Sequence, residues 1–116
     1  MTSEQPTRKN ELTAAKTFAL ADLVQYQDGA IVSRTLISRV TATVTLFAFD
    51  YGQGLSEHTS PFDALAQMLE GEAEITISGK ELSANAGEIV LLPANHPHAL
   101  KAASRFKLLL TMIRSA

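Results

Sequence analysis

Short segments in which apolar and polar residues alternate are the feature that most constrains this fold. Residues 72–78 place Ala73, Ile75 and Ile77 on one side of an extended chain and their polar neighbours on the other. Because successive side chains of a β-strand point to opposite faces, this period of two predicts a strand with one buried face. Residues 105–113 alternate in the same way and predict a second such strand.

Further strand candidates follow from β-branched and apolar runs, at residues 30–38, 42–50 and 89–92. The pairs Asp28-Gly29 and Ser78-Gly79 are typical of tight turns between strands. Only residues 20–27 hint at a helix. Many short strands separated by turns predict an all-β protein, a small sandwich or barrel.

The chain has 116 residues and a mass of 12.5 kDa, which is the size of one domain. We expect residues 15–116 to form the barrel domain. Residues 1–14 mix charges with proline and small polar residues, which predicts a flexible N-terminal arm. The alternative is an arm that adds a strand to a partner subunit.

Composition excludes several classes of function. The net charge of −2 argues against nucleic acid and anionic membranes as partners, because both attract an excess of basic residues. The absence of cysteine excludes disulfide scaffolds, thiolate zinc sites and cysteine nucleophiles. The polar N-terminus lacks the apolar core of a secretory signal, and no apolar run is long enough to span a membrane. A cytoplasmic protein is therefore expected.

Two segments carry glycine, histidine and proline at fixed offsets: GQGLSEHTSPFDALAQMLEG (residues 52–71) and GEIVLLPANHPHAL (residues 87–100). Together they resemble the two motifs of the cupin family, and the 15 residues between them match the short spacing of small single-domain bacterial cupins. The matching positions are Gly52, His58, Gly71, Gly87, Pro93 and His98. The resemblance implies a small jelly-roll β-barrel, often dimeric.

Cupins commonly bind a divalent metal through two histidines and a glutamate of the first motif and a histidine of the second. His58 and His98 match the first and last of these ligands, whereas Ser60 and Ala64 stand at the other two positions. A serine hydroxyl is a poor ligand and alanine offers none, while catalytic zinc sites typically keep three protein ligands. The resemblance therefore implies at most weak binding of one divalent ion, such as Zn, Ni, Mn or Fe.

Three neighbours are candidate helpers for such an ion. His96 adds an imidazole two residues from His98, Asp63 adds a carboxylate beside Ala64, and Gln67 adds an amide oxygen. Alternation from Ala64 puts the Gln67 side chain on the opposite face. Simpler roles remain open: an exposed loop position for His96, a turn position for Asp63, and a packed barrel position for Gln67.

The register of the motifs predicts a small-molecule pocket around His58 and His98. Its other predicted lining residues are Ser60, Ala64, Ala66 and Met68. A mostly apolar lumen of this kind suits a small ligand anchored by imidazoles. Four functions remain open: a metal-dependent isomerase, dioxygenase or lyase, a metal-free binding or sensing module, an assembly protein with a filled lumen, and a metal-free enzyme that uses His58 or His98 as a general acid or base.

A homodimer is expected, because open edge strands must be protected and a second subunit can do so. Ile31, Ile37, Phe47 and Phe49 fall into one alternation class on two of the predicted strands. That class is an interface if it faces outward and part of the core if it faces inward.

Overall fold

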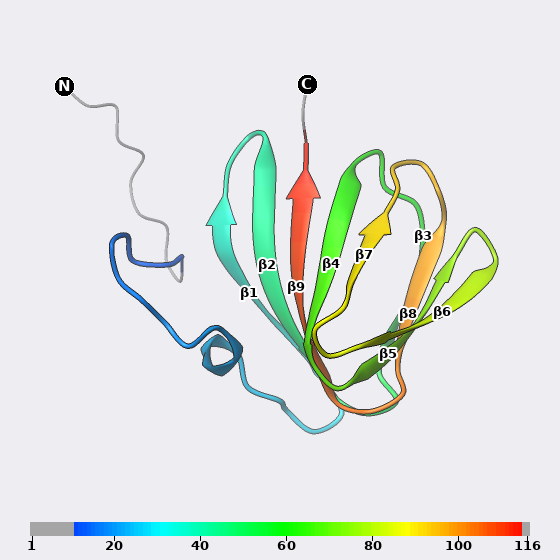
Figure 1. Ribbon diagram of the computed structural model, residues 1–116, viewed down its shortest axis with the longest axis horizontal. Helices are drawn as coiled ribbons and strands as arrows, with labels where there is room; N and C mark the ends of the chain where they lie inside the picture. Colours follow the sequence, from blue (N-terminus) through cyan, green and yellow to red (C-terminus); the bar gives the residue numbers. More distant parts are fainter. Residues whose placement is uncertain (1–10, 115–116) are drawn as a thin grey trace.

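Nine antiparallel strands form two facing sheets in the computed structural model, which describes residues 11–114 (Figure 1). The strands are β1 (Ile31–Ser38), β2 (Ala42–Phe49), β3 (Gly54–His58), β4 (Asp63–Glu70), β5 (Glu72–Ile77), β6 (Lys80–Asn85), β7 (Ile89–Leu92), β8 (His98–Ala102) and β9 (Phe106–Ile113). Residues that hinted at a helix form only a short 3-10 helix, η1 (Leu20–Leu23). Within residues 11–114, no helix is long and apolar enough to cross a membrane.

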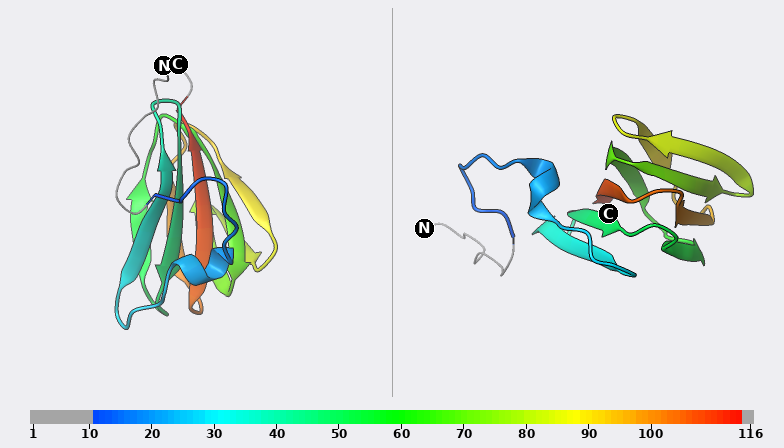
Figure 2. Two further views of the ribbon diagram at one scale, coloured as in Figure 1. Left: turned by 90° about the vertical axis from the view of Figure 1, so that its left-hand side faces the viewer. Right: turned by 90° about the horizontal axis from the view of Figure 1, so that it is seen from below.

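The two sheets have the strand orders β1-β2-β9-β4-β7 and β3-β8-β5-β6. Strands that are distant in sequence, such as β2 and β9, are neighbours in a sheet, as a jelly roll requires (Figures 1 and 2). The prediction of an all-β jelly roll is therefore confirmed. Each strand candidate drawn from alternation or β-branched runs corresponds to one strand of the structure.

The main core lies between the two sheets. Phe49 of β2 and Phe106 of β9 are fully buried there, with stacked rings whose centroids are 4.4 Å apart. Ala64, Ala66 and Met68 project into the same core from β4. Burial of one such large apolar side chain contributes about 1.5–3 kcal/mol to stability.

A second apolar cluster covers part of the outer face of the five-stranded sheet. Residues 11–27 lie over β1 and β2 there, and Val24 packs against Leu36 and Leu46 (Figure 2). The Leu12 amide also donates a hydrogen bond to the Leu36 carbonyl at 3.0 Å. Residues 1–10 of the predicted N-terminal arm lie outside the described residues.

A buried lysine fastens this N-terminal segment to the sheet. The Lys107 ammonium donates to the Ala21 carbonyl at 2.7 Å and lies 3.8 Å from the Glu70 carboxylate. The Tyr26 hydroxyl donates to the same carboxylate at 2.6 Å. Burial and this hydrogen bond both raise the pKa of Tyr26. The charge of Lys107 is thus compensated where it is buried.

The alternation class of Phe47 and Phe49 faces inward, so it is not an interface. Phe49 is fully buried, and Phe47 packs against the main core. A shift in register between Thr35 and Ile37 breaks the alternation of β1, so Ile37 pairs with Val44 instead of continuing the inward row. Ile37 alone of this class is exposed, at 40%.

Gly71 is the corner at which the chain passes from the five-stranded to the four-stranded sheet. Its φ of +80° is left-handed, and a Cβ there would collide with the Arg105 carbonyl oxygen. Gly79 has the matching φ of +81° with nothing within 4 Å of its Cβ position. An alanine at position 79 would therefore add backbone strain but no steric collision.

We expect Gly71→Ala to lower the free energy of unfolding clearly more than Gly79→Ala does. Left-handed backbone costs an L-residue roughly 1–2 kcal/mol, and both variants share this loss. Only the Gly71 variant adds a steric collision with backbone that cannot move freely. Urea unfolding of both variants and the parent measures the difference, and equal losses would contradict a close approach at this corner.

Candidate functional site

His58 and His98 lie opposite each other where two neighbouring strands meet. Strand β3 pairs with β8 in a register that joins Leu55 to Leu100 and, after an irregularity, His58 to His98. The imidazole rings meet edge to face, with centroids 4.3 Å apart. His98 is buried, at 7% exposure, whereas His58 is exposed. The pair therefore joins the interior of the barrel to solvent.

Both rings are oriented by backbone carbonyl groups. The Nδ1 atom of His58 is 2.9 Å from the Ser56 carbonyl oxygen, and that of His98 is 3.3 Å from the His96 carbonyl oxygen. A carbonyl oxygen can only accept, so Nδ1 is the protonated nitrogen of each ring. Each neutral ring then keeps Nε2 as a hydrogen-bond acceptor.

Burial favours the neutral form of His98. Desolvation lowers the pKa of His98 below the ordinary histidine value, and a positive charge on His58 lowers it further. The hydrogen bond to the His96 carbonyl opposes these effects. At neutral pH, His98 is therefore an uncharged acceptor inside the protein.

The two rings line a small, partly open cavity of about 40 Å³. A single water needs roughly 10–15 Å³, so the cavity admits a group of a few heavy atoms. Apart from the histidines, its lining is entirely apolar: Phe47, Phe49, Leu55, Leu92, Leu100, Leu108 and Leu110. Ligand sites usually combine an apolar lining with a few polar groups, as here, but measure roughly 300–1,000 Å³, so this cavity can hold only a short part of a ligand.

The candidate helpers do not join the two histidines. The Nδ1 atom of His96 is 3.0 Å from the Ser78 hydroxyl oxygen, on a neighbouring loop. An oxygen of Asp63 accepts a hydrogen bond from the Ala94 amide at 2.8 Å. Gln67 is exposed on the face of β4 opposite to Ala66 and Met68. None of these three side chains therefore lies with His58 and His98.

The donor set does not fit the four-ligand metal centre typical of cupins. Within residues 11–114, no group of three or more histidine, aspartate or glutamate side chains could hold a metal ion. Ser60, at the position of the second histidine, accepts a hydrogen bond from the Phe62 amide at 3.2 Å. Ala64 is buried in the main core. Of the four donors expected of such a centre, the two imidazoles of His58 and His98 remain within the described part of the chain.

The lining of the cavity differs from the lining expected from the sequence. Ala64, Ala66 and Met68 belong to the main core and Ser60 to the β3–β4 connection, and none of the four lines the cavity. The apolar lining residues come chiefly from β2 and β9, which supply two each, while β3, β7 and β8 supply one each. The sequence offered one signal for these lining residues, because alternation places Leu108 with Leu110, and Phe47 with Phe49, on a common face of a strand. Only the packing of the sheets shows which group faces inward.

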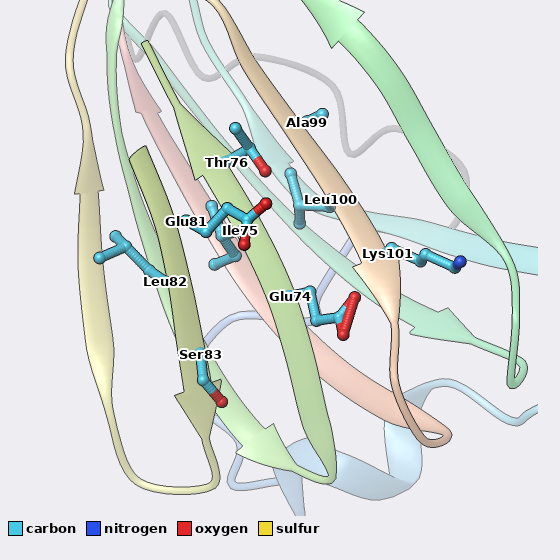
Figure 3. Close-up of a pocket in the computed structure, with 9 residues that line it drawn as sticks. All are labelled: Glu74, Ile75, Thr76, Glu81, Leu82, Ser83, Ala99, Leu100 and Lys101. Carbon is cyan, nitrogen blue, oxygen red and sulfur yellow. The ribbon is translucent and has the colours of Figure 1, made fainter. Parts of the chain in front are cut away.

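A larger hollow lies on the outer face of the four-stranded sheet, as a groove of about 460 Å³ (Figure 3). Its polar side chains are Glu74, Thr76, Glu81, Ser83 and Lys101. They stand opposite to Ile75, which is buried in the core. Solvent reaches these groups and competes with any ligand, so the groove is the poorer candidate despite its size.

Comparisons of the sequence and of the structure with known proteins point to one family. A family profile described as a cupin domain matches residues 45–113. A search of curated proteins returned no match. The structure is similar to that of a conserved protein of unknown function from Streptococcus pyogenes, with 34% identity, a TM-score of 0.89 and coverage of 97% of this chain and 99% of the other.

Two further solved structures are similar. One is a cupin superfamily protein from Desulfitobacterium hafniense, with 27% identity, a TM-score of 0.84 and coverage of 93% of this chain and 98% of the other. The other is a cupin 2 conserved barrel domain protein from Leptotrichia buccalis, with 40% identity and a TM-score of 0.79. That match covers 83% of this chain and 47% of the other.

The lowered pKa of His98 predicts how stability depends on pH. An unfolded chain holds this proton at a pKa of about 6.5, whereas the folded protein releases it at a lower pH. The contribution of His98 to the free energy of unfolding is complete above the pKa of the unfolded chain. It declines as the pH falls from there toward the pKa of the folded protein, because the unfolded state then binds more protons. His98→Gln should weaken this decline, as urea unfolding across the pH range measures. An NMR titration that gives His98 a pKa at or above the ordinary value would contradict the prediction.

Proposed function

The chain belongs to the cupin family, and from this premise we propose that it binds, without a metal, a small neutral molecule that carries a hydroxyl or N–H donor. One observation carries the proposal: among residues 11–114, His58 and His98 are the only polar side chains that line an otherwise apolar, partly open cavity. With Nδ1 bound to carbonyl oxygens, the acceptor of each ring is Nε2.

The chemistry of the cavity selects the class of ligand. A neutral His98 accepts a hydrogen bond from a hydroxyl or N–H group, whereas a carboxylate would require a protonated ring. Burial opposes that protonation. The cavity of about 40 Å³ receives only a short apolar group, so a larger ligand extends past the exposed His58. A primary alcohol with a short chain is the simplest probe.

We expect propan-1-ol to shift the NMR signals of His58, His98 and the neighbouring leucine methyl groups at neutral pH, and propanoate to shift them much less. The two probes have the same number of carbons and differ in whether they donate a hydrogen bond or carry a negative charge. Saturable shifts from the alcohol alone would support the proposal. Tighter binding of propanoate would overturn it, because an anion needs a protonated ring.

Substitution of the buried acceptor tests the same site. His98→Leu keeps an apolar side chain of moderate size and removes Nε2, so the affinity for propan-1-ol should fall about tenfold, the equivalent of one buried hydrogen bond. His96→Ala is the matched control, because His96 contacts Ser78 outside the cavity. An equal loss of affinity for propan-1-ol in both variants would contradict a specific role for His98. Circular dichroism of each variant checks that it is folded.

A weakly bound divalent ion is the second candidate, favoured by the same two carbonyl contacts. Histidines that bind metals commonly donate their other ring N–H to a carbonyl or carboxylate, which orients the ring. Two imidazoles could hold Zn, Ni, Mn or Fe only with water in the remaining positions, and such a site binds weakly.

Elemental analysis separates the two candidates. The proposal of a metal-free site predicts far less than one equivalent of any metal in protein purified without chelator and then loaded with Zn, Ni, Mn or Fe(II). It also predicts that a chelator leaves propan-1-ol binding unchanged. About one equivalent of metal that His58→Ala removes and His96→Ala retains would establish the second candidate instead.

A further inference from the structure

Leu55 on β3 lies at the border between the small cavity and solvent. Within the described part of the chain, it is the only apolar lining residue of the cavity that is exposed, at 37%, while the others are buried or half-buried. Its register partner on β8 is Leu100, which is buried. Paired side chains lie on the same face of a sheet, so Leu55 points inward beside Leu100. An inward side chain that remains exposed lies at the mouth of the interior.

An irregularity in β3 brings Leu55 and His58 to the same face. The two are three residues apart, so a regular strand would point them to opposite faces. Between them, residues 56–57 of β3 stand opposite one residue of β8, Ala99, which is the count of a β-bulge. The Ser56 carbonyl, inside this bulge, lies 2.9 Å from the Nδ1 atom of His58. The bulge therefore aims an apolar and a polar group at the same mouth.

Strand β3 is held close to β8 immediately before Leu55. A Cβ on Gly54 would collide with the Leu100 carbonyl oxygen, so the glycine allows the two backbones to approach. On its other side β3 has no neighbouring strand among residues 11–114, because it is the edge strand of its sheet. Leu55 is therefore positioned by its pairing with β8 and faces solvent, and truncation of its side chain would widen the mouth.

We propose that Leu55 determines how long the apolar part of the ligand can be, an inference that rests on the function proposed above. The floor of the cavity consists of buried side chains such as Phe49 and Leu108, whose positions are fixed by the close packing of the core. Leu55 closes the open side of this space. The cavity of about 40 Å³ then takes a short unbranched chain, and the further carbons of a longer alcohol stay in water.

The affinities of a short and a long alcohol measure this limit. In the parent protein, hexan-1-ol should bind no more than about twofold tighter than propan-1-ol, because methylene groups left in water contribute little. Leu55→Ala removes every side-chain carbon beyond Cβ and lengthens the cavity. Each further methylene that becomes buried should then tighten the binding of hexan-1-ol about fourfold. NMR titration of the leucine methyl and His98 signals gives both dissociation constants and their ratio.

Leu65→Ala is the matched control. Leu65 is exposed to nearly the same extent, at 36%, and lies on β4 outside the cavity. Its variant should keep the ratio of the parent protein. Leu55→Val removes a single carbon and keeps a residue that favours strands, so it should raise the ratio less, and it tests the proposal even if Leu55→Ala does not fold. An unchanged ratio in the folded Leu55 variants would overturn the proposal.

The role of Leu55 and the proposed function fail in different ways. If the parent protein binds propan-1-ol and the ratio does not depend on residue 55, only the role of Leu55 is wrong. Binding of hexan-1-ol to the parent protein more than tenfold tighter than propan-1-ol would also overturn the limit and leave the proposed function standing. If the parent protein binds neither alcohol, the proposed function fails, and the role of Leu55 fails with it.

Discussion

Burial of one alternation class of side chains between the two sheets is the interaction on which the rest of this structure depends. Phe49, Ile75 and Phe106 are fully buried in that layer. Because neighbouring side chains of a strand point to opposite faces, inward placement of one class places the other class outward. The core and the cavity thus share one face of the five-stranded sheet, while the second apolar cluster, which the N-terminal segment covers, lies on the other.

The character of the candidate site follows from what fills the interior around it. Where a metal-binding cupin has a carboxylate, this chain has Ala64, which is packed into the core. The remaining cavity is small and almost entirely apolar, so the buried His98 experiences little competition from water, whereas His58 stays exposed at the mouth. A hydrogen bond made in such surroundings is stronger than one made at the surface. The same surroundings keep His98 uncharged, which links the depth of the site to the class of ligand it accepts.

Some elements could be predicted from the sequence and others could not, for physical reasons visible in particular residues. Alternation identified β5 and β9, because each has one face against the core. Strand β3 has all five residues exposed, so it shows no pattern, and its pairing with β8 alone defines it. His96 stands two residues from His98, yet its ring meets Ser78 across a loop contact that sequence spacing does not reveal.

The sequence by itself determined the all-β class and the cupin motifs that single out His58 and His98, because turn residues, local alternation and motif spacing are properties of neighbouring residues. Only the tertiary structure decided which alternation class is buried, how small the cavity is and which nitrogen of each ring carries the proton. Alternation defines two faces without saying which is inward. That choice depends on contacts between strands far apart in the chain, such as those of β2 with β9 and β3 with β8.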